Sequence, residues 1–160
     1  MRRVLFLFLL IVLGGARSAD AQVLGYAIAG PAGFSGFFGS NAAGGQAAAG
    51  AEVLLGSRAG VGGEFGVMVN SSSAMWVTSV NGVLHVLPGT RGHGTSPFVT
   101  GGYTRLSSGD GTFDAWNAGA GIDIWPKDRI GIRIEFRDQI RTDSRGNVHY
   151  WTMRVGVAVR

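Results

Sequence analysis

Two stretches near the end of the chain alternate strictly between apolar residues and charged or small ones. The first sets Ile130, Ile132, Ile134 and Phe136 against Gly131, Arg133, Glu135 and Arg137. The second sets Trp151, Met153, Val155, Val157 and Val159 against Thr152, Arg154, Gly156 and Ala158. A period of two predicts extended strands with two unlike faces. A fold built on such strands must keep one apolar face and one polar face apart.

The rest of the chain favours strands over helices. Glycine accounts for 28 of 160 residues, well above the usual ~7%. Each glycine inside a helix costs about 1 kcal/mol, and no helical stripe of apolar residues runs along the chain. We expect six strands before the two terminal ones, which are joined by Thr142 to Asn147. The six cover residues 22–28, 47–55, 59–69, 75–87, 97–106 and 113–125.

Most of these strands are long. Several run for nine to thirteen residues, close to the ~9–11 tilted residues that cross a bilayer. The pattern does not assign the two faces of the first and fifth strands. Trp125 is out of phase with Ile122 and Ile124, so its orientation is also left open.

The first twenty-one residues predict a cleaved signal peptide. Arg2 and Arg3 precede an apolar run, Val4 to Leu13, and Ala19-Asp20-Ala21 supplies small residues for cleavage. A run of ten is too short for a spanning helix, which needs roughly 20 residues. We therefore expect export through the general secretory pathway and one domain over residues 22–160.

Composition excludes several functional classes. Without Arg2, Arg3, Arg17 and Asp20, eleven basic and nine acidic residues remain, a net charge of +2. No cluster of Lys or Arg is present, so we expect no nucleic-acid partner. The chain has no cysteine, so disulfides cannot hold an exported domain of this size.

Export, an even strand number and two unlike faces together predict a transmembrane barrel. Lipid offers no hydrogen-bond partners, so a sheet in a bilayer must close on itself. We expect an all-β, eight-stranded, antiparallel up-and-down barrel. Eight strands enclose just enough space for side chains. The residues expected to point inward and form an ion-pair network that plugs the lumen are Glu52, Glu64, Asp123, Arg133, Glu135, Arg137 and Arg154.

Aromatic residues and the lengths of the links between strands predict how the barrel is oriented in the membrane. Trp76, Trp116 and Trp151 each fall near the start of an even-numbered strand, on its apolar face. Even strands of an up-and-down barrel start at the same rim, so the three indoles are expected at one membrane interface. Long segments at Ala29 to Gln46, Ser107 to Thr112 and Thr142 to Asn147 are expected as outer loops.

The whole mature chain resembles the small eight-stranded outer-membrane barrels of Gram-negative bacteria, the OmpA-like or outer membrane protein beta-barrel domain group. The residues that carry the resemblance are the signal peptide and the segments 97–103, 119–123 and 154–160. It implies a monomer in the outer membrane. Its implied partners are membrane lipid, lipopolysaccharide and the assembly machinery. Such proteins usually end in an aromatic residue, whereas this chain ends in Arg160.

The sequence shows no motif for chemistry. His85, His93 and His149 lack metal-ligand spacing, so we expect neither a metal nor a cofactor. The first hypothesis is a non-enzymatic barrel with a structural, anchoring or surface-interaction role.

Two alternatives remain. One is a lipid-modifying enzyme at the outer rim, where the resemblance draws attention to Ser107, Ser108, Asp110 and His149. The other is a soluble periplasmic lipocalin-like barrel that binds a small ligand. That second alternative needs an apolar interior and a polar exterior.

Overall fold

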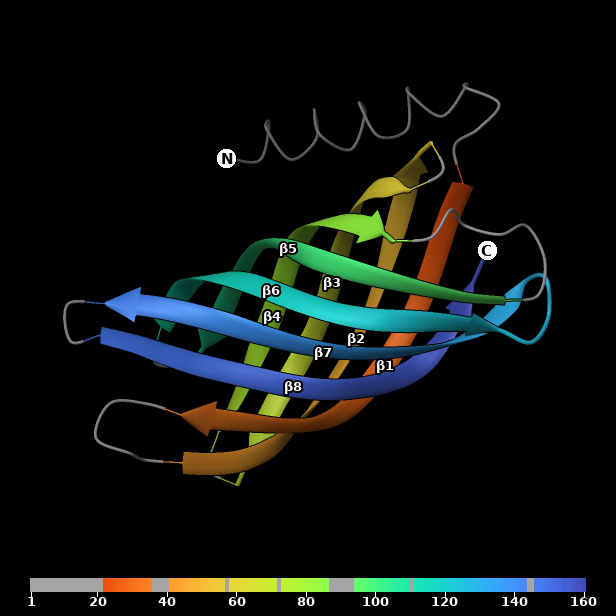
Figure 1. The fold of residues 1–160 in the computed structure, drawn as a ribbon. Helices are drawn as coiled ribbons and strands as arrows, with labels where there is room; N and C mark the ends of the chain where they lie inside the picture. Colours follow the sequence, from red (N-terminus) through yellow and green to blue (C-terminus); the bar gives the residue numbers. More distant parts are fainter. Residues whose placement is uncertain are drawn as a thin grey trace.

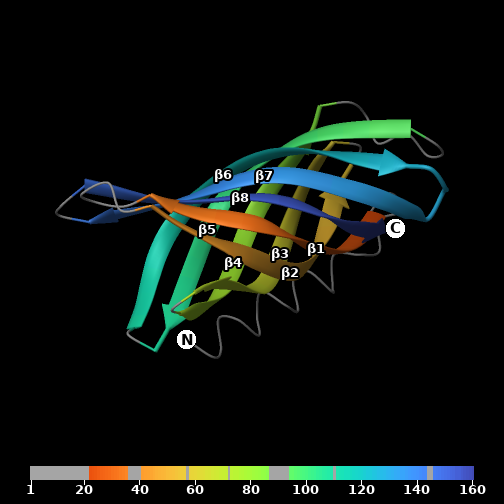
Figure 2. The same cartoon turned by 90° about the horizontal axis from the view of Figure 1, so that it is seen from below.

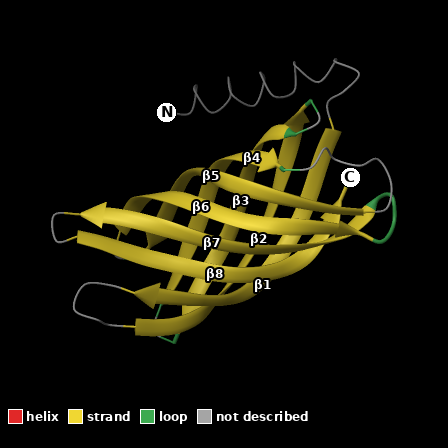
Figure 3. Ribbon diagram, viewed as in Figure 1, coloured by secondary structure: helices red, strands yellow, loops and turns green. Residues whose placement is uncertain are grey.

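The structure is a computed structural model that describes residues 22–35, 41–56, 58–71, 73–86, 94–109, 111–143 and 146–160. The predicted signal peptide, residues 1–21, lies outside the described residues. The strands are β1 (Gln22–Ser35), β2 (Asn41–Leu55), β3 (Ala59–Asn70), β4 (Ala74–His85), β5 (Gly94–Ser108), β6 (Gly111–Trp125), β7 (Ile130–Asp143) and β8 (Gly146–Val159). In Figure 3 the described residues are strands linked by loops and turns. No described helix is long and apolar enough to span a bilayer.

Each strand pairs antiparallel with the next, and β8 pairs with β1 to close the sheet (Figure 1). The predicted eight-stranded up-and-down barrel is therefore confirmed. An even strand number puts the start of β1 and the end of β8 at one rim, as Figure 2 also shows. We call this the terminal rim and the opposite end the distal rim.

The register of the strands fixes their tilt. Following paired residues around the barrel from Leu24 leads back to Phe34 on the same strand, a shift of ten positions. Such a stagger requires strands inclined to the barrel axis. It also brings residues that are far apart in sequence to the same height inside the barrel.

The seam between β1 and β8 depends on glycine at an inward position. A Cβ atom added at Gly156 would lie 1.9 Å from the carbonyl oxygen of Ala27 on β1. No side chain fits at that distance, so glycine allows the first and last strands to approach and close the sheet.

The predicted outer loops are wrong in length. Most of Ala29 to Gln46 is strand, because β1 and β2 stay paired up to Ser35 and Asn41. The same holds for the other two segments, where only residues 109–110 and 144–145 separate the strands. Small and polar residues break the apolar alternation at these strand ends, but backbone pairing does not need large apolar side chains. The longest link between strands, residues 86–93, joins β4 to β5 at the terminal rim and not at the end where long outer loops were expected.

Burial assigns the faces that the sequence left open. On β1, Leu24, Tyr26 and Ile28 point inward, and on β5 Phe98 does so. Trp125 is also inward and only 3% exposed. The Arg160 guanidinium lies 4.1 Å from the centre of the Trp125 ring. The indole of Trp125 thus covers the interior at the terminal rim. This explains why Trp125 lies on the opposite face of β6 from Ile122 and Ile124.

Candidate functional site

The barrel interior holds the seven charged residues that the sequence pattern selected. The structure places all of them on inward positions of β2, β3, β6, β7 and β8, each 3% exposed or less. Three arginines thus meet four carboxylates inside one small barrel. Buried charges are tolerated only when they are paired and hydrogen-bonded, so their contacts decide what the interior can do.

The first group centres on Arg133. Its Nε and Nη2 donate to the two carboxylate oxygens of Asp123 at 2.9 and 3.2 Å, and its Nη1 donates to Glu52 at 2.6 Å. The guanidinium also lies between two rings, 4.4 Å from the centre of Tyr26 and 4.3 Å from that of Phe98. Charge, hydrogen bonds and ring faces therefore hold this cation on every side.

His85 extends this first group. Its Nδ1 lies 2.9 Å from the Ser96 hydroxyl, and its Nε2 lies 3.9 Å from the second carboxylate oxygen of Glu52. The imidazole therefore links the Arg133 group to β5, and it is buried like the other members.

The second group lies near the centres of β3, β7 and β8. Arg154 donates to both carboxylate oxygens of Glu64 at 2.6 and 3.1 Å and reaches Glu135 at 3.0 Å. Arg137 donates to the same two carboxylates, at 3.1 Å to Glu64 and 2.7 Å to Glu135. The Tyr26 hydroxyl donates to Glu64 at 3.0 Å and so connects the two groups.

Apolar clusters lie on both sides of the second group. One contains Leu24, Tyr26, Ile28, Trp125 and Ala158 and lies toward the terminal rim. The other, toward the distal rim, contains Ala32, Met68, Val77, Leu106 and Ala115, with Phe34, Met75, Phe113 and Tyr150 packed against it. Sequence reasoning missed both clusters. The alternation of side chains along β4 and β8 nevertheless puts Val77 and Ala158 on the same faces as the inward polar residues of those strands.

The outer surface is apolar over most of its height. Phe65, Val80, Phe136, Val155 and many similar side chains are between about a third and two thirds exposed. This arrangement of a charged interior and an apolar exterior is the reverse of what a soluble ligand-binding barrel requires. The soluble alternative therefore has no support in the fold.

The three predicted interface tryptophans all point outward. Trp76, Trp116 and Trp151 lie on β4, β6 and β8 in the halves of these strands that face the distal rim, and all are exposed. Trp76 stacks on Phe65, with ring centres 5.3 Å apart, and Trp116 meets Tyr103 edge-on at 6.2 Å.

Polar side chains also occur on the outer surface at this level. Arg105 pairs with Asp114 at 3.1 Å, and the Tyr103 hydroxyl donates to the same carboxylate. Further round the barrel, His149 Nδ1 lies 2.7 Å from Asp138 Oδ2. The alternation of β7 and β8, extended by one more position on each strand, would have placed Asp138 and His149 on this face.

The rim residues considered for lipid chemistry are not brought together as a group. Ser107 and Ser108 end β5, whereas His149 lies on β8, with β6 and β7 between them. Asp110 and His93 lie outside the described residues. Among the described residues, no group of three or more His, Cys, Asp or Glu side chains could hold a metal ion.

Comparison with solved structures identifies the fold. Neisserial surface protein A matches with a TM-score of 0.72 at 15% identity, over 88% of this chain and 98% of that one. The chain has the fold of a small outer-membrane β-barrel. The N-terminal barrel of Pseudomonas aeruginosa OprF matches with a TM-score of 0.59 at 19% identity, over 84% of this chain and 96% of that one.

A third structure agrees. The outer membrane protein OprG of Pseudomonas aeruginosa matches this small barrel with a TM-score of 0.61 at 7% identity, over 88% of this chain and 96% of that chain. None of these three proteins is named as an enzyme. No protein-family model matches the chain, and no curated protein does.

Proposed function

We propose that this protein is an integral barrel of the bacterial outer membrane with a structural, anchoring or surface-interaction role, and that its ion-pair network closes the lumen. The observation that carries the proposal is the order of layers inside the barrel. Apolar clusters lie toward both rims, and the Glu64, Glu135, Arg137 and Arg154 group lies between them. Such an interior leaves the outer surface and the links between strands to meet other molecules.

Three features support a place in the membrane. The outer surface is apolar, the sheet has no open edge, and the similar structures are outer-membrane and surface proteins. Trp76, Trp116 and Trp151 would then lie at the interface near the distal rim, where indoles are favoured. The proposed partners are outer-membrane lipid, lipopolysaccharide and the assembly machinery. A monomer would suffice, because pairing of β1 with β8 already satisfies every strand edge.

The closed lumen predicts that the barrel does not conduct ions. The purified protein, folded in detergent and added to a planar bilayer, should give no stepwise conductance. Folding is checked by gel mobility without boiling, because a closed barrel resists unfolding by dodecyl sulfate until it is heated. Regular ion-sized steps from a folded sample would contradict the proposed lumen.

The location and orientation predict a labelling pattern in cells. The chain has no cysteine, so a single introduced thiol reports one position. An exported chain enters the outer membrane from the periplasm, and an even number of strands leaves both chain ends on the periplasmic side. The terminal rim is therefore expected to face the periplasm and the distal rim the outside of the cell. Gly109→Cys, at the distal rim, should therefore react with a membrane-impermeant maleimide on intact cells. Lys127→Cys, in the β6–β7 turn at the terminal rim, should react only after the outer membrane is permeabilised.

The unaltered chain is the control, because it has no thiol and should stay unlabelled. Labelling of Lys127→Cys alone on intact cells would reverse the orientation. Failure of both variants to react until the cells are lysed would place the protein elsewhere.

A further inference from the structure

The outward face of β7 and β8 carries an acid and an imidazole where most neighbouring side chains are apolar or aromatic. Asp138 and His149 are joined by a contact of 2.7 Å between Oδ2 and Nδ1, and their side chains are 26% and 41% exposed. Ionisable groups on a lipid-facing surface are costly, and where they occur they usually serve a function. The pair is also independent of the interior network, because it lies on the opposite face of the sheet.

The contact fixes how the imidazole is presented. Since a carboxylate can only accept a hydrogen bond, Nδ1 carries the proton in the neutral ring and Nε2 keeps its lone pair. The other carboxylate oxygen, Asp138 Oδ1, is buried and has no hydrogen-bond partner among the described residues. His149 therefore presents a base whose orientation an acid holds in place.

A hydroxyl lies beside this base on the next strand. Ser35 on β1 is the register partner of His149 on β8, and both side chains are on the outward face. The Cβ atoms of such directly opposed residues lie about 4.5–5.5 Å apart, so the Ser35 hydroxyl is a cross-strand neighbour of the His149 imidazole. Acid, imidazole and hydroxyl thus follow one another across β7, β8 and β1.

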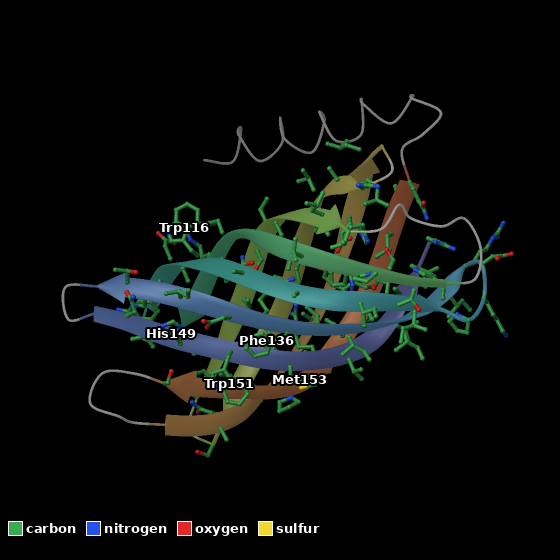
Figure 4. All side chains as sticks on the ribbon, viewed as in Figure 1. Trp116, Phe136, His149, Trp151 and Met153 are labelled. Atoms are coloured by element: carbon green, nitrogen blue, oxygen red, sulfur yellow. The ribbon has the colours of Figure 1, made fainter. Side chains whose placement is uncertain are left out.

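The surroundings indicate what could reach these groups. The Trp151 indole lies against β1 at Gly33, two residues before Ser35, where an added Cβ would be 2.2 Å from its ring. In Figure 4, His149 lies nearer the distal rim, and Trp151, Phe136 and Met153 follow toward the middle of the barrel. Phe136 and Met153 are register partners and are both exposed. A molecule placed here would have its polar part at the tryptophan level and an apolar chain along Phe136 and Met153.

We propose that Ser35, His149 and Asp138 form an ester-hydrolysing site on the outside of the barrel, which acts on acyl esters of membrane lipids. Ester carbonyls of lipids lie between the head groups and the hydrocarbon, at the level where interfacial indoles sit. This inference adds an activity to the proposed anchoring role and does not depend on the state of the lumen.

The chemistry is acyl transfer to serine followed by hydrolysis. The Ser35 hydroxyl oxygen bonds to the ester carbonyl carbon while His149 Nε2 takes its proton. The bond from carbonyl carbon to alkoxy oxygen then breaks, and the imidazolium returns the proton to the leaving alkoxide. Water repeats the two steps on the acyl-serine and releases a fatty acid and free Ser35. Asp138 is a positioning residue that holds the His149 ring in this orientation through the contact between Oδ2 and Nδ1.

The test measures fatty acid release from vesicles that contain the folded barrel. One set contains phosphatidylethanolamine and phosphatidylglycerol, and the other contains lipopolysaccharide as well, so the two sets tell which lipid is the source. Fatty acids are quantified by mass spectrometry. We expect release in at least one set, and Ser35→Ala or His149→Asn should lower the rate at least a hundredfold. Asp138→Asn should lower kcat and also shift the pH profile, which a merely structural role would not do.

Controls separate loss of activity from loss of folding. Ser107→Ala removes another outward hydroxyl near the distal rim and should leave the rate unchanged, and every variant must show the mobility of a folded barrel before boiling. A fluorophosphonate probe should add one mass label to the wild-type chain and none to Ser35→Ala. A folded barrel that releases no fatty acid and takes no label would overturn the proposal, as would full activity in Ser35→Ala.

Discussion

Replacement of Arg133 by leucine is expected to lower the free energy of unfolding by about 3–5 kcal/mol. The change removes the cation that Asp123 and Glu52 share and leaves two carboxylates buried without it. It also removes the guanidinium that packs between the rings of Tyr26 and Phe98. The measurement is urea unfolding of the protein in lipid vesicles, followed by tryptophan fluorescence.

A matched control lies on the same barrel. Arg105→Leu breaks an arginine–carboxylate pair of similar geometry, but that pair is on the outer surface and about half exposed. Exposed pairs contribute little to stability, so Arg105→Leu should unfold close to the wild-type urea concentration. Equal effects of the two replacements would show that the Arg133 group does not hold the barrel together.

A compensated variant tests the physical reason for the loss. Arg133→Met combined with Glu52→Gln and Asp123→Asn removes the whole charged group and leaves no carboxylate behind. Removing one member of a buried ion group leaves an uncompensated charge in the interior, whereas neutralising all three members leaves none. The triple variant should therefore be more stable than Arg133→Leu, although it carries two more changes.

The pairing partners inside the barrel show where sequence reasoning reaches its limit. Parity along β7 is sufficient to place Arg133, Glu135 and Arg137 on one face, because side chains alternate strictly. Glu52, however, is 81 residues away from Arg133. The two meet because the register shifts by ten positions around the barrel, and that stagger is set by all eight strand pairs together. No local pattern encodes it.

The apolar ends of the interior were hidden for a different reason. On β1, inward Leu24 and Ile28 stand beside outward Val23 and Ala27, so both faces are apolar and no alternation of polarity remains. The strands also extend past the apolar surface toward the distal rim, where Ser35 and Asn41 pair. Backbone hydrogen bonds hold these ends, and such bonds leave no trace in the side-chain pattern. The same extension brings Ser35 beside His149.

Replacement of Val155 by arginine is expected to cost about 2–4 kcal/mol if the outer surface faces lipid. Val155 is 54% exposed on the outward face of β8 and pairs with Ile134, with apolar residues before and after it on that face. A charge there would lie near the middle of the hydrocarbon and lose its hydration. The measurement is the same urea titration in lipid vesicles.

Val159 supplies a control that differs only in depth. It lies on the same strand and the same face, is 50% exposed, and ends β8 at the terminal rim. The cost of a charge on the lipid face falls to about 0–1 kcal/mol near the interface, so Val159→Arg should unfold almost like the wild type. In a water-soluble barrel both side chains would face solvent, and both replacements would be nearly neutral. A large loss for Val155→Arg with a small one for Val159→Arg therefore requires a membrane around the barrel, and two equally small losses would rule it out.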